Sequence, residues 1–347
     1  MTSVVRGFSP LDEVLQLGEQ GWSPATIELA LRLGVEIPSL RRAAEAFRII
    51  TRLPMSKSTL QRLAYETGQQ LVVIQAEEAE AIVRIPAKEE EVVYRQVPEP
   101  DSEMMNVSSD GVMLHIRKEG WKEVKVVAIS AVEQRVDPNS GESLVRLTRH
   151  SYRAGLWETK TFTNHLWAEA CRRGLERAKL VVSVNDGAPW IWGIVLMCFA
   201  RCLQILDWWH AVQYLWTMAQ AHFDQDGAAA TRWVEQQKRL LAASRLHLVF
   251  ANVRRLYPRH QPLPDPVRKA IVYLFHHRWR MRYREFRQAG CPIGSGSVES
   301  ACKVVVQQRM KQAGMQWSRP GAQAMLALRC ALLSDRWSLV QTLLRPS

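Results

Sequence analysis

The stretch MMNVSSDGVMLHI, residues 104–116, decides the fold. Its alternating pattern and β-branched residues predict a strand. Two further stretches of the same kind follow, WKEVKVVAIS at 121–130 and SLVRLTRHSY at 143–152, and the segment DPNSGES between them is typical of a turn. We therefore expect three consecutive strands joined as hairpins.

Helices and strands alternate after these three strands. FTNHLWAEACRRGLERA (162–178) reads as a helix, KLVVSV (179–184) as a short buried strand, WIWGIVLMCFA (190–200) as a buried helix and LQIL (203–206) as a fifth strand. The order β-β-β-α-β-α-β is that of a ribonuclease-H-like domain. The predicted fold class is therefore α/β plus all-α, with a ribonuclease-H-like core at 103–210.

The flanking regions are predicted to be helical. Residues 211–289 read as an all-helical insertion, and residues 290–347 as C-terminal helices that complete the core. Residues 1–85 form a helical N-terminal domain, and the segment PAKEEEVVYRQVPEP, with proline at both ends and an acidic run, makes 86–102 a linker.

The N-terminal domain contains a possible helix-turn-helix. Ser23 and Ser39 are placed as N-caps, and Gly34 and Gly68 as the ends of the first and third helices. The third helix opens with Ser, Lys, Ser and Thr, which favours DNA contact. Because the segment is slightly acidic, an ordinary helical bundle remains the alternative. The residues expected to face DNA are Lys57, Thr59, Gln61 and Arg62.

Charge is concentrated in one part of the chain. The net charge of the 347 residues is +12, but residues 1–100 hold 11 basic and 14 acidic residues, whereas residues 232–287 hold 14 basic and 3 acidic ones. A field of this kind favours a polyanion, most simply nucleic acid, although arginine-rich solvated helices are the alternative. Six scattered cysteines without a Cys-x-x-Cys pair favour a reducing cytoplasm over a zinc ribbon, and no membrane span is predicted.

Two acids lie on strands of the predicted sheet. Asp110 lies inside the first strand, where an acid is disfavoured, and Asp186 lies at the carboxyl end of the fourth. In a ribonuclease-H-like sheet these strands are neighbours, so the two carboxylates would repel unless a cation lies between them. Magnesium or manganese, as two ions, fits such a site. The alternatives are a solvated strand acid for Asp110 and a turn or cap acid for Asp186.

A third acid follows the Gly/Ser loop in GCPIGSGSVESACK, residues 290–303. Glycines 290, 294 and 296 would allow close approach to the sheet, Ser297 would cap the helix, and Glu299 would complete a triad with Asp110 and Asp186. The alternative is that Glu299 only complements the helix dipole. Beyond it, a phosphate backbone would be contacted by Lys303, Arg309 and Lys311.

The stretch RWRMRYREF, residues 278–286, interleaves basic and aromatic side chains. Trp279, Tyr283 and Phe286 share one face of an ideal helix, which predicts that they are buried. The alternative is that aromatic side chains stack on unpaired bases. The arginines predicted to face phosphate are Arg278, Arg280, Arg282 and Arg284.

The motifs DGVML…WKEVKVVAIS, VNDGAPWIW, LDWWHAVQYLW and CPIGSGSVESACK together resemble the DDE transposases of bacterial insertion sequences, specifically the ISKra group, which is related to Mutator-like transposases. The resemblance covers about residues 105–330. It implies that Asp110, Asp186 and Glu299 are catalytic metal ligands. DWWH resembles the family's C/D-x-x-H motif, which implies that Asp207 and His210 support the metal site, the alternative being a buried hydrogen-bonded pair or an N-cap.

The function implied is metal-dependent DNA cleavage and strand transfer at insertion-sequence ends. The implied partners are double-stranded DNA, as terminal inverted repeats and target, and further copies of the chain, in a bacterial cytoplasm and on the nucleoid. The alternatives are a non-catalytic DNA-binding protein derived from a transposase and a ribonuclease-H-fold nuclease. These transposases often carry a Cys-rich zinc region ahead of the helix-turn-helix. Its absence here favours the non-catalytic alternative, whereas the intact acid triad argues against it.

Overall fold

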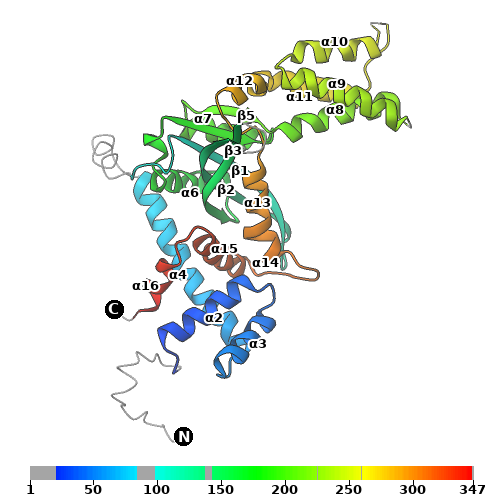
Figure 1. Cartoon of the computed structure of the whole chain (residues 1–347). Helices are drawn as coiled ribbons and strands as arrows, with labels where there is room; N and C mark the ends of the chain where they lie inside the picture. Colours follow the sequence, from blue (N-terminus) through cyan, green and yellow to red (C-terminus); the bar gives the residue numbers. More distant parts are fainter. Residues whose placement is uncertain (1–20, 84–97, 137–142, 225, 259, 346–347) are drawn as a thin grey trace, which may run out of the picture.

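A five-stranded mixed sheet is the centre of the computed structural model, which describes residues 21–83, 98–136, 143–224, 226–258 and 260–345 (Figure 1). The strand order is β3-β2-β1-β4-β5, with β1, β2 and β3 antiparallel and with β4 and β5 parallel to β1. The first and fourth strands are therefore neighbours, as predicted. The strands are β1 Met104–Ile116, β2 Gly120–Val136, β3 Ser143–Gly155, β4 Leu180–Asn185 and β5 Leu203–Leu206.

Each face of the sheet has its own hydrophobic core, because successive side chains of a strand point to opposite faces. Along β2, Val126 and Ala128 join one core, and Val127 and Ile129 join the other. The second core is covered by α6 (Thr159–Arg172) and α7 (Pro189–Cys198). The first is covered by α13 (Gly296–Ala301), the π-helix η3 (Cys302–Gln307), α14 (Gln308–Met310) and α15 (Arg319–Leu333).

The N-terminal helices share the first core with the C-terminal ones. They are α2 (Pro24–Glu36), α3 (Leu40–Thr51) and α4 (Lys57–Val83), and α16 (Ser338–Leu344) packs against α2 and α4. Ser23 and Ser39 are N-caps, as predicted.

Two predicted helix ends are wrong. Gly34 lies inside α2 and Gly68 lies inside α4. Both glycines sit where another helix approaches closely. A Cβ on Gly34 would lie 3.2 Å from the side chain of Leu60, and one on Gly68 would lie 2.6 Å from the carbonyl oxygen of Ala324 in α15. Tertiary packing, not helix termination, therefore explains these glycines.

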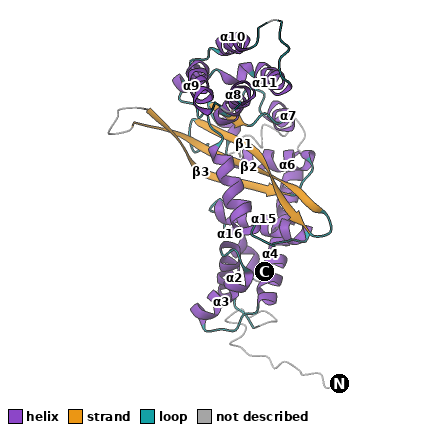
Figure 2. Ribbon diagram, turned by 90° about the vertical axis from the view of Figure 1, so that its right-hand side faces the viewer, coloured by secondary structure: helices purple, strands orange, loops and turns teal. Residues whose placement is uncertain are grey.

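A group of helices extends from the β5 edge of the sheet and shares a core with β4 and β5. It contains the elements α8 (Trp208–Phe223), α9 (Gly227–Ala242), α10 (Leu246–Leu256), α11 (Asp265–His276), the 3-10 helix η2 (Arg278–Met281) and α12 (Tyr283–Gln288). Figures 1 and 2 show α8–α11 at one end of the sheet and α2 and α3 at the other. The all-helical character predicted for 211–289 is confirmed in the described residues.

Most of the predicted linker, residues 86–97, and most of the DPNSGES turn, residues 137–142, lie outside the described residues. Within the described part of the chain, none of the helices is long and apolar enough to cross a membrane.

Candidate active site

Asp110 lies in β1 beyond the part of that strand that pairs with β4, which covers residues 104–106. Its carboxylate is partly buried and accepts two hydrogen bonds: Oδ1 from the Gly111 backbone N–H at 2.7 Å, and Oδ2 from the Cys302 thiol at 3.4 Å. Burial, with a contribution from Asp110, raises the pKa of the Cys302 thiol, so this group remains a donor. The sequence analysis missed Cys302 because its partner is distant along the chain.

Asp186 follows β4 directly and its Oδ1 accepts a hydrogen bond of 3.0 Å from the Ala188 backbone N–H. This turn leads into α7, so Asp186 makes the turn contact that the sequence offered as an alternative. The neighbouring Asn185 accepts a hydrogen bond of 2.7 Å from the backbone of Ser109, which fastens β1 to β4 beyond their ladder. Asp110 and Asp186 therefore belong to adjacent strands, Asp110 inside β1 and Asp186 directly after β4.

Glu299 lies in the first turn of α13 and is exposed. Its Oε1 accepts a hydrogen bond of 2.9 Å from the Ser295 hydroxyl. The N-cap position belongs to Ser295, so the prediction that Ser297 caps this helix is wrong. Ser297 is buried and accepts a hydrogen bond of 3.4 Å from Asn106 of β1.

The glycines of this loop differ in their roles. Gly290 has a φ of +71°, and a Cβ there would clash with the side chain of Gln134, so this position requires glycine. A Cβ on Gly296 would meet open space, which means that close approach does not explain that glycine.

The three acids, Asp110, Asp186 and Glu299, interact electrostatically. Burial raises the pKa of Asp110 above its usual value, and repulsion from Asp186 and Glu299 raises it further, against hydrogen bonds that lower it. In the described residues, no three His, Cys, Asp or Glu side chains lie close enough to hold one metal ion.

Asp207 is fully buried and is the N-cap of α8. Its Oδ1 accepts the His210 backbone N–H at 2.7 Å, and its Oδ2 accepts the Ser295 backbone N–H at 2.6 Å. Burial alone would raise the pKa of Asp207, but the hydrogen bonds from His210 and Ser295 outweigh it and the pKa is lowered. Asp207 is therefore the capping, hydrogen-bonded group of the alternative interpretation, and it also anchors the loop that leads to Glu299.

His210 lies beside Asp207, with 3.4 Å between Nδ1 and Oδ1. The hydrogen bond to Asp207 raises the pKa of His210, with smaller contributions from Asp186 and Glu299. The imidazole therefore lies in the negative electrostatic field of these carboxylates. Its raised pKa means that it stays protonated at a higher pH than a free histidine does.

Two tyrosines lie beside Asp186 that the sequence analysis did not find. Tyr214 of α8 and Tyr273 of α11 stack with ring centroids 3.9 Å apart. The Tyr273 hydroxyl lies where a Cβ on Gly187 would be, at 1.9 Å from it, so only glycine fits after Asp186. Burial raises the pKa of Tyr273, and Asp186 adds to the rise. No local pattern pairs two residues that lie on different helices.

The predicted DNA-facing cations divide into three groups. Arg309 is only 1% exposed, and its guanidinium donates hydrogen bonds to the carbonyl oxygens of Gly34 and Pro38. Its predicted phosphate contact is wrong, because the side chain holds the end of α2. Arg280 is half-buried, bonded to Gln204 and stacked 4.3 Å from the Trp192 ring. The exposed members are Lys57, Arg62, Arg278, Arg282, Arg284, Lys303 and Lys311.

The stretch RWRMRYREF does not form one helix. It breaks at Arg282 between η2 and α12. Tyr283 and Phe286 are buried, as predicted, but Trp279 is 69% exposed and Met281 takes the buried position. The tighter 3-10 turn rotates residue 279 out of the face that an ideal α-helix would give it.

The fold and the site define a mixed α/β protein in which three acids, in β1, after β4 and in α13, interact electrostatically. Residues 8–337 match the family described as Uncharacterised protein family (UPF0236), and the chain belongs to this family. A comparison with curated proteins gives no match.

Proposed function

We propose that the protein is a transposase of the DDE type, which cleaves DNA at the ends of an insertion sequence and joins the freed strand to target DNA. The observation that carries this proposal is that Asp186, directly after β4, and Glu299 of α13 both repel Asp110 of β1, whose pKa is raised chiefly by burial. The strand order β3-β2-β1-β4-β5 supports a ribonuclease-H-like core as part of the same proposal.

The donor set fits a hard divalent cation. All three groups are carboxylates, and in the described residues one oxygen each of Asp186 and Glu299 accepts no hydrogen bond. A cation would also relieve the repulsion among them. Binding would draw the carboxylates together, which the exposed side chain of Glu299 permits. When bound, two magnesium or manganese ions would activate the attacking oxygen and stabilise the leaving one.

The other residues of the site orient and balance these acids. Asp207 holds the loop at Ser295, and the Ser295 hydroxyl orients Glu299. His210, with its raised pKa, offers a positive charge or a hydrogen bond to a phosphate oxygen beside Asp186. The exposed arginines of η2 and α12 supply sequence-independent attraction to duplex DNA. The proposal includes terminal repeats and target DNA as partners, self-association on DNA and action in the bacterial cytoplasm.

The test is incubation of the purified chain with magnesium and DNA that carries the inverted repeats flanking its gene, followed by sequencing of the products. We expect cleavage at the repeat ends and joining of the 3′ ends to target DNA. Asp110→Asn, Asp186→Asn and Glu299→Gln should abolish both steps and leave DNA binding intact, whereas Glu77→Gln, an exposed acid on α4, should change neither. DNA binding without cleavage would instead identify a non-catalytic binding protein, and cleavage without joining a nuclease.

A further inference from the structure

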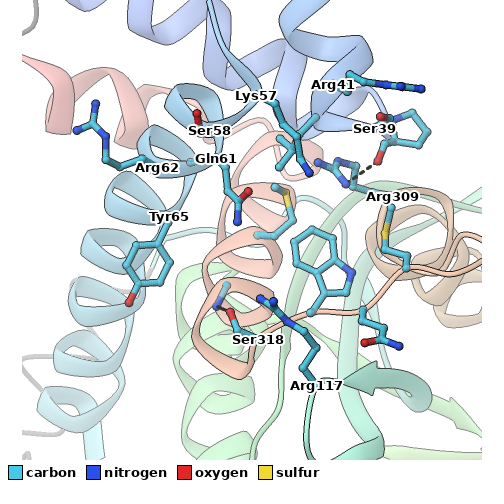
Figure 3. Close-up of a pocket in the computed structure, with 18 residues that line it drawn as sticks. Ser39, Arg41, Lys57, Ser58, Gln61, Arg62, Tyr65, Arg117, Arg309 and Ser318 are labelled. Carbon is cyan, nitrogen blue, oxygen red and sulfur yellow. Dashed lines mark hydrogen bonds between the residues drawn. The ribbon is translucent and has the colours of Figure 1, made fainter.

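A groove of about 960 Å³ lies between the first turns of α3 and α4 on one side and residues 315–321, with the β1–β2 hairpin, on the other (Figure 3). Lys57 and Gln61 of α4 face it, and Arg117 and Arg309 line it from the other elements. We refer to it as the basic groove. It is separate from the acidic site, because none of the acids or their hydrogen-bonding partners lines it.

The charge of the basic groove has one sign. Five cations line it and, in the described residues, no Asp or Glu does. One of the five, Arg62, also pairs with Glu66 at 3.4 Å on the same helix. The cations are Arg41, Lys57, Arg62, Arg117 and Arg309.

Two arginines of this region are buried: Arg309, which lines the groove, and Arg329, which does not line it but repels Arg309. Arg309 and Arg329 are 1% and 5% exposed, and their guanidinium groups donate to backbone carbonyl oxygens. No described carboxylate forms an ion pair with either. Burial lowers the pKa of both, that of Arg309 to about 10, so both remain charged at neutral pH. Glu36 acts electrostatically on Arg329, whereas only burial and repulsion from Arg329 act on Arg309. Buried positive charge is costly, and an anion in the groove would offset that cost at Arg309.

Aromatic groups accompany the cations. Tyr65, two turns along α4 from Lys57, is 44% exposed. Trp317 is half-buried, is fixed by a hydrogen bond of 2.9 Å from its indole N–H to the carbonyl of Met310, and lies 5.5 Å from the guanidinium of Arg309. Cations next to aromatic faces match the two parts of a nucleotide, its phosphate and its base.

We infer that the basic groove binds an unpaired stretch of a DNA strand, with phosphates on Lys57 and Arg117 and a base against Tyr65. This inference rests on the proposed function, which supplies DNA as the partner. A duplex would need the face of α4 that carries Lys57, Gln61 and Tyr65 to enter its major groove. Residues 315–318 line the groove across from that face. This arrangement favours an extended single strand over a duplex.

The test is fluorescence anisotropy of the full chain with a labelled single strand of about 12 thymidines and with a duplex of the same length. The Lys57→Ala/Arg117→Ala variant should bind the single strand at least about tenfold more weakly, with a salt dependence reduced by about 1.4 in the log–log slope for two phosphates lost. Its duplex affinity should stay unchanged. Tyr65→Ala should also weaken single-strand binding, and Tyr65→Phe should retain it.

Controls separate this result from general effects. Lys160→Ala/Arg201→Ala removes two exposed cations outside the groove and should alter neither affinity. Melting curves establish that each variant is folded. The inference is overturned if the groove variants bind the single strand like the wild type, if they lose duplex affinity equally, or if free thymidine monophosphate competes as well as the strand at equal nucleotide concentration. Asp110→Asn should keep single-strand binding, so a failure of the cleavage proposal would be seen separately.

Discussion

Ser295 and Asp207, 88 residues apart, are joined by a hydrogen bond of 2.6 Å from the Ser295 backbone N–H to Asp207 Oδ2. Asp207 begins α8, and the Ser295 hydroxyl bonds to Glu299 of α13. The start of the helical region and the loop before Glu299 therefore form one unit. A change at Asp207 should alter both the stability of α8 and the position of Glu299.

Replacing Asp207 tests how much its two hydrogen bonds contribute to stability. Asp207→Ala removes an N-cap, worth about 1 kcal/mol, and leaves the buried Ser295 N–H unpaired, which costs about 1–3 kcal/mol more. We expect the free energy of unfolding to fall by about 2–4 kcal/mol in urea denaturation. Asp207→Asn keeps one oxygen acceptor and should lose less.

Asp226 provides the matched control for Asp207. It caps α9 with a hydrogen bond of 2.9 Å from the Ala229 backbone N–H and is exposed. Asp226→Ala should therefore cost only the cap, about 1 kcal/mol. Equal losses for the two alanine variants would mean that the contact with Ser295 contributes nothing.

The ionised form of Asp110 destabilises the folded state. Its pKa is raised, chiefly by burial and further by repulsion, so its ionised form is disfavoured in the fold. Because the folded state binds the proton more tightly than the unfolded one, this penalty is present above the raised pKa and disappears as the pH falls through it. Asp110→Asn should therefore raise the melting temperature at pH 7.

Magnesium should stabilise the wild type more than it stabilises Asp110→Asn. The metal alone, added to the wild type, should raise its melting temperature by binding the folded state, and it should have less effect on Asp110→Asn. Glu77→Gln, far along α4, should respond to magnesium like the wild type. A melting temperature of the wild type that does not change up to millimolar magnesium would contradict a metal site made of these acids.

Much of the sheet was predictable because its signals are local. Period-two alternation predicted β1 with its bounds and most of β2 and β3, and LQIL coincides with β5. The order of elements also predicted that β1 and β4 are neighbours, which places Asp110 and Asp186 on adjacent strands. The functional interpretation of these two acids stays a prediction.

The remaining features depend on contacts between distant residues. Arg309 looked like a phosphate contact because nothing near it in the sequence shows that it bonds to the carbonyl oxygen of Gly34. The pair Tyr214 and Tyr273 meets only because α8 and α11 pack together. The exposure of Trp279 follows from a change from α-helical to 3-10 geometry, which helical periodicity does not register.

Gly68 tests whether packing outweighs helix propensity. Alanine favours a helix over glycine by about 1 kcal/mol, so Gly68→Ala in the middle of α4 would stabilise an isolated helix. In the fold its Cβ would lie 2.6 Å from the Ala324 carbonyl oxygen, and overpacking costs about 1–3 kcal/mol. We expect a net loss of stability of about 0–2 kcal/mol in urea denaturation, after the gain in propensity of about 1 kcal/mol is subtracted.

Gly193 is the matched control for Gly68. It also lies in a helix, α7, but a Cβ there would have no heavy atom within 4 Å. Gly193→Ala should therefore stabilise the protein by about 0.5–1 kcal/mol. If Gly68→Ala were stabilising to the same extent, the close contact between α4 and α15 would be wrong.

His165 gives the protein a stability that depends on pH. Its ring stacks on Trp157 with centroids 4.0 Å apart, the residue is 4% exposed, and its Nδ1 has no hydrogen-bond partner in the described residues. Burial, with repulsion from Arg153, lowers the pKa of His165 from 6.5 to about 4. The folded imidazole therefore stays neutral at pH values where the unfolded one takes a proton, so stability is complete above about pH 6.5 and falls as the pH drops toward 4. The loss should be on the order of 2 kcal/mol by pH 5, measured as the change in unfolding free energy between pH 7.5 and pH 5.

Two variants test this assignment. His165→Phe should show a smaller fall in stability over the same pH range, because phenylalanine takes no proton. The control His247→Phe, at an exposed position, should show the same fall as the wild type. An identical fall in His165→Phe and the wild type would mean that other groups control the acid sensitivity.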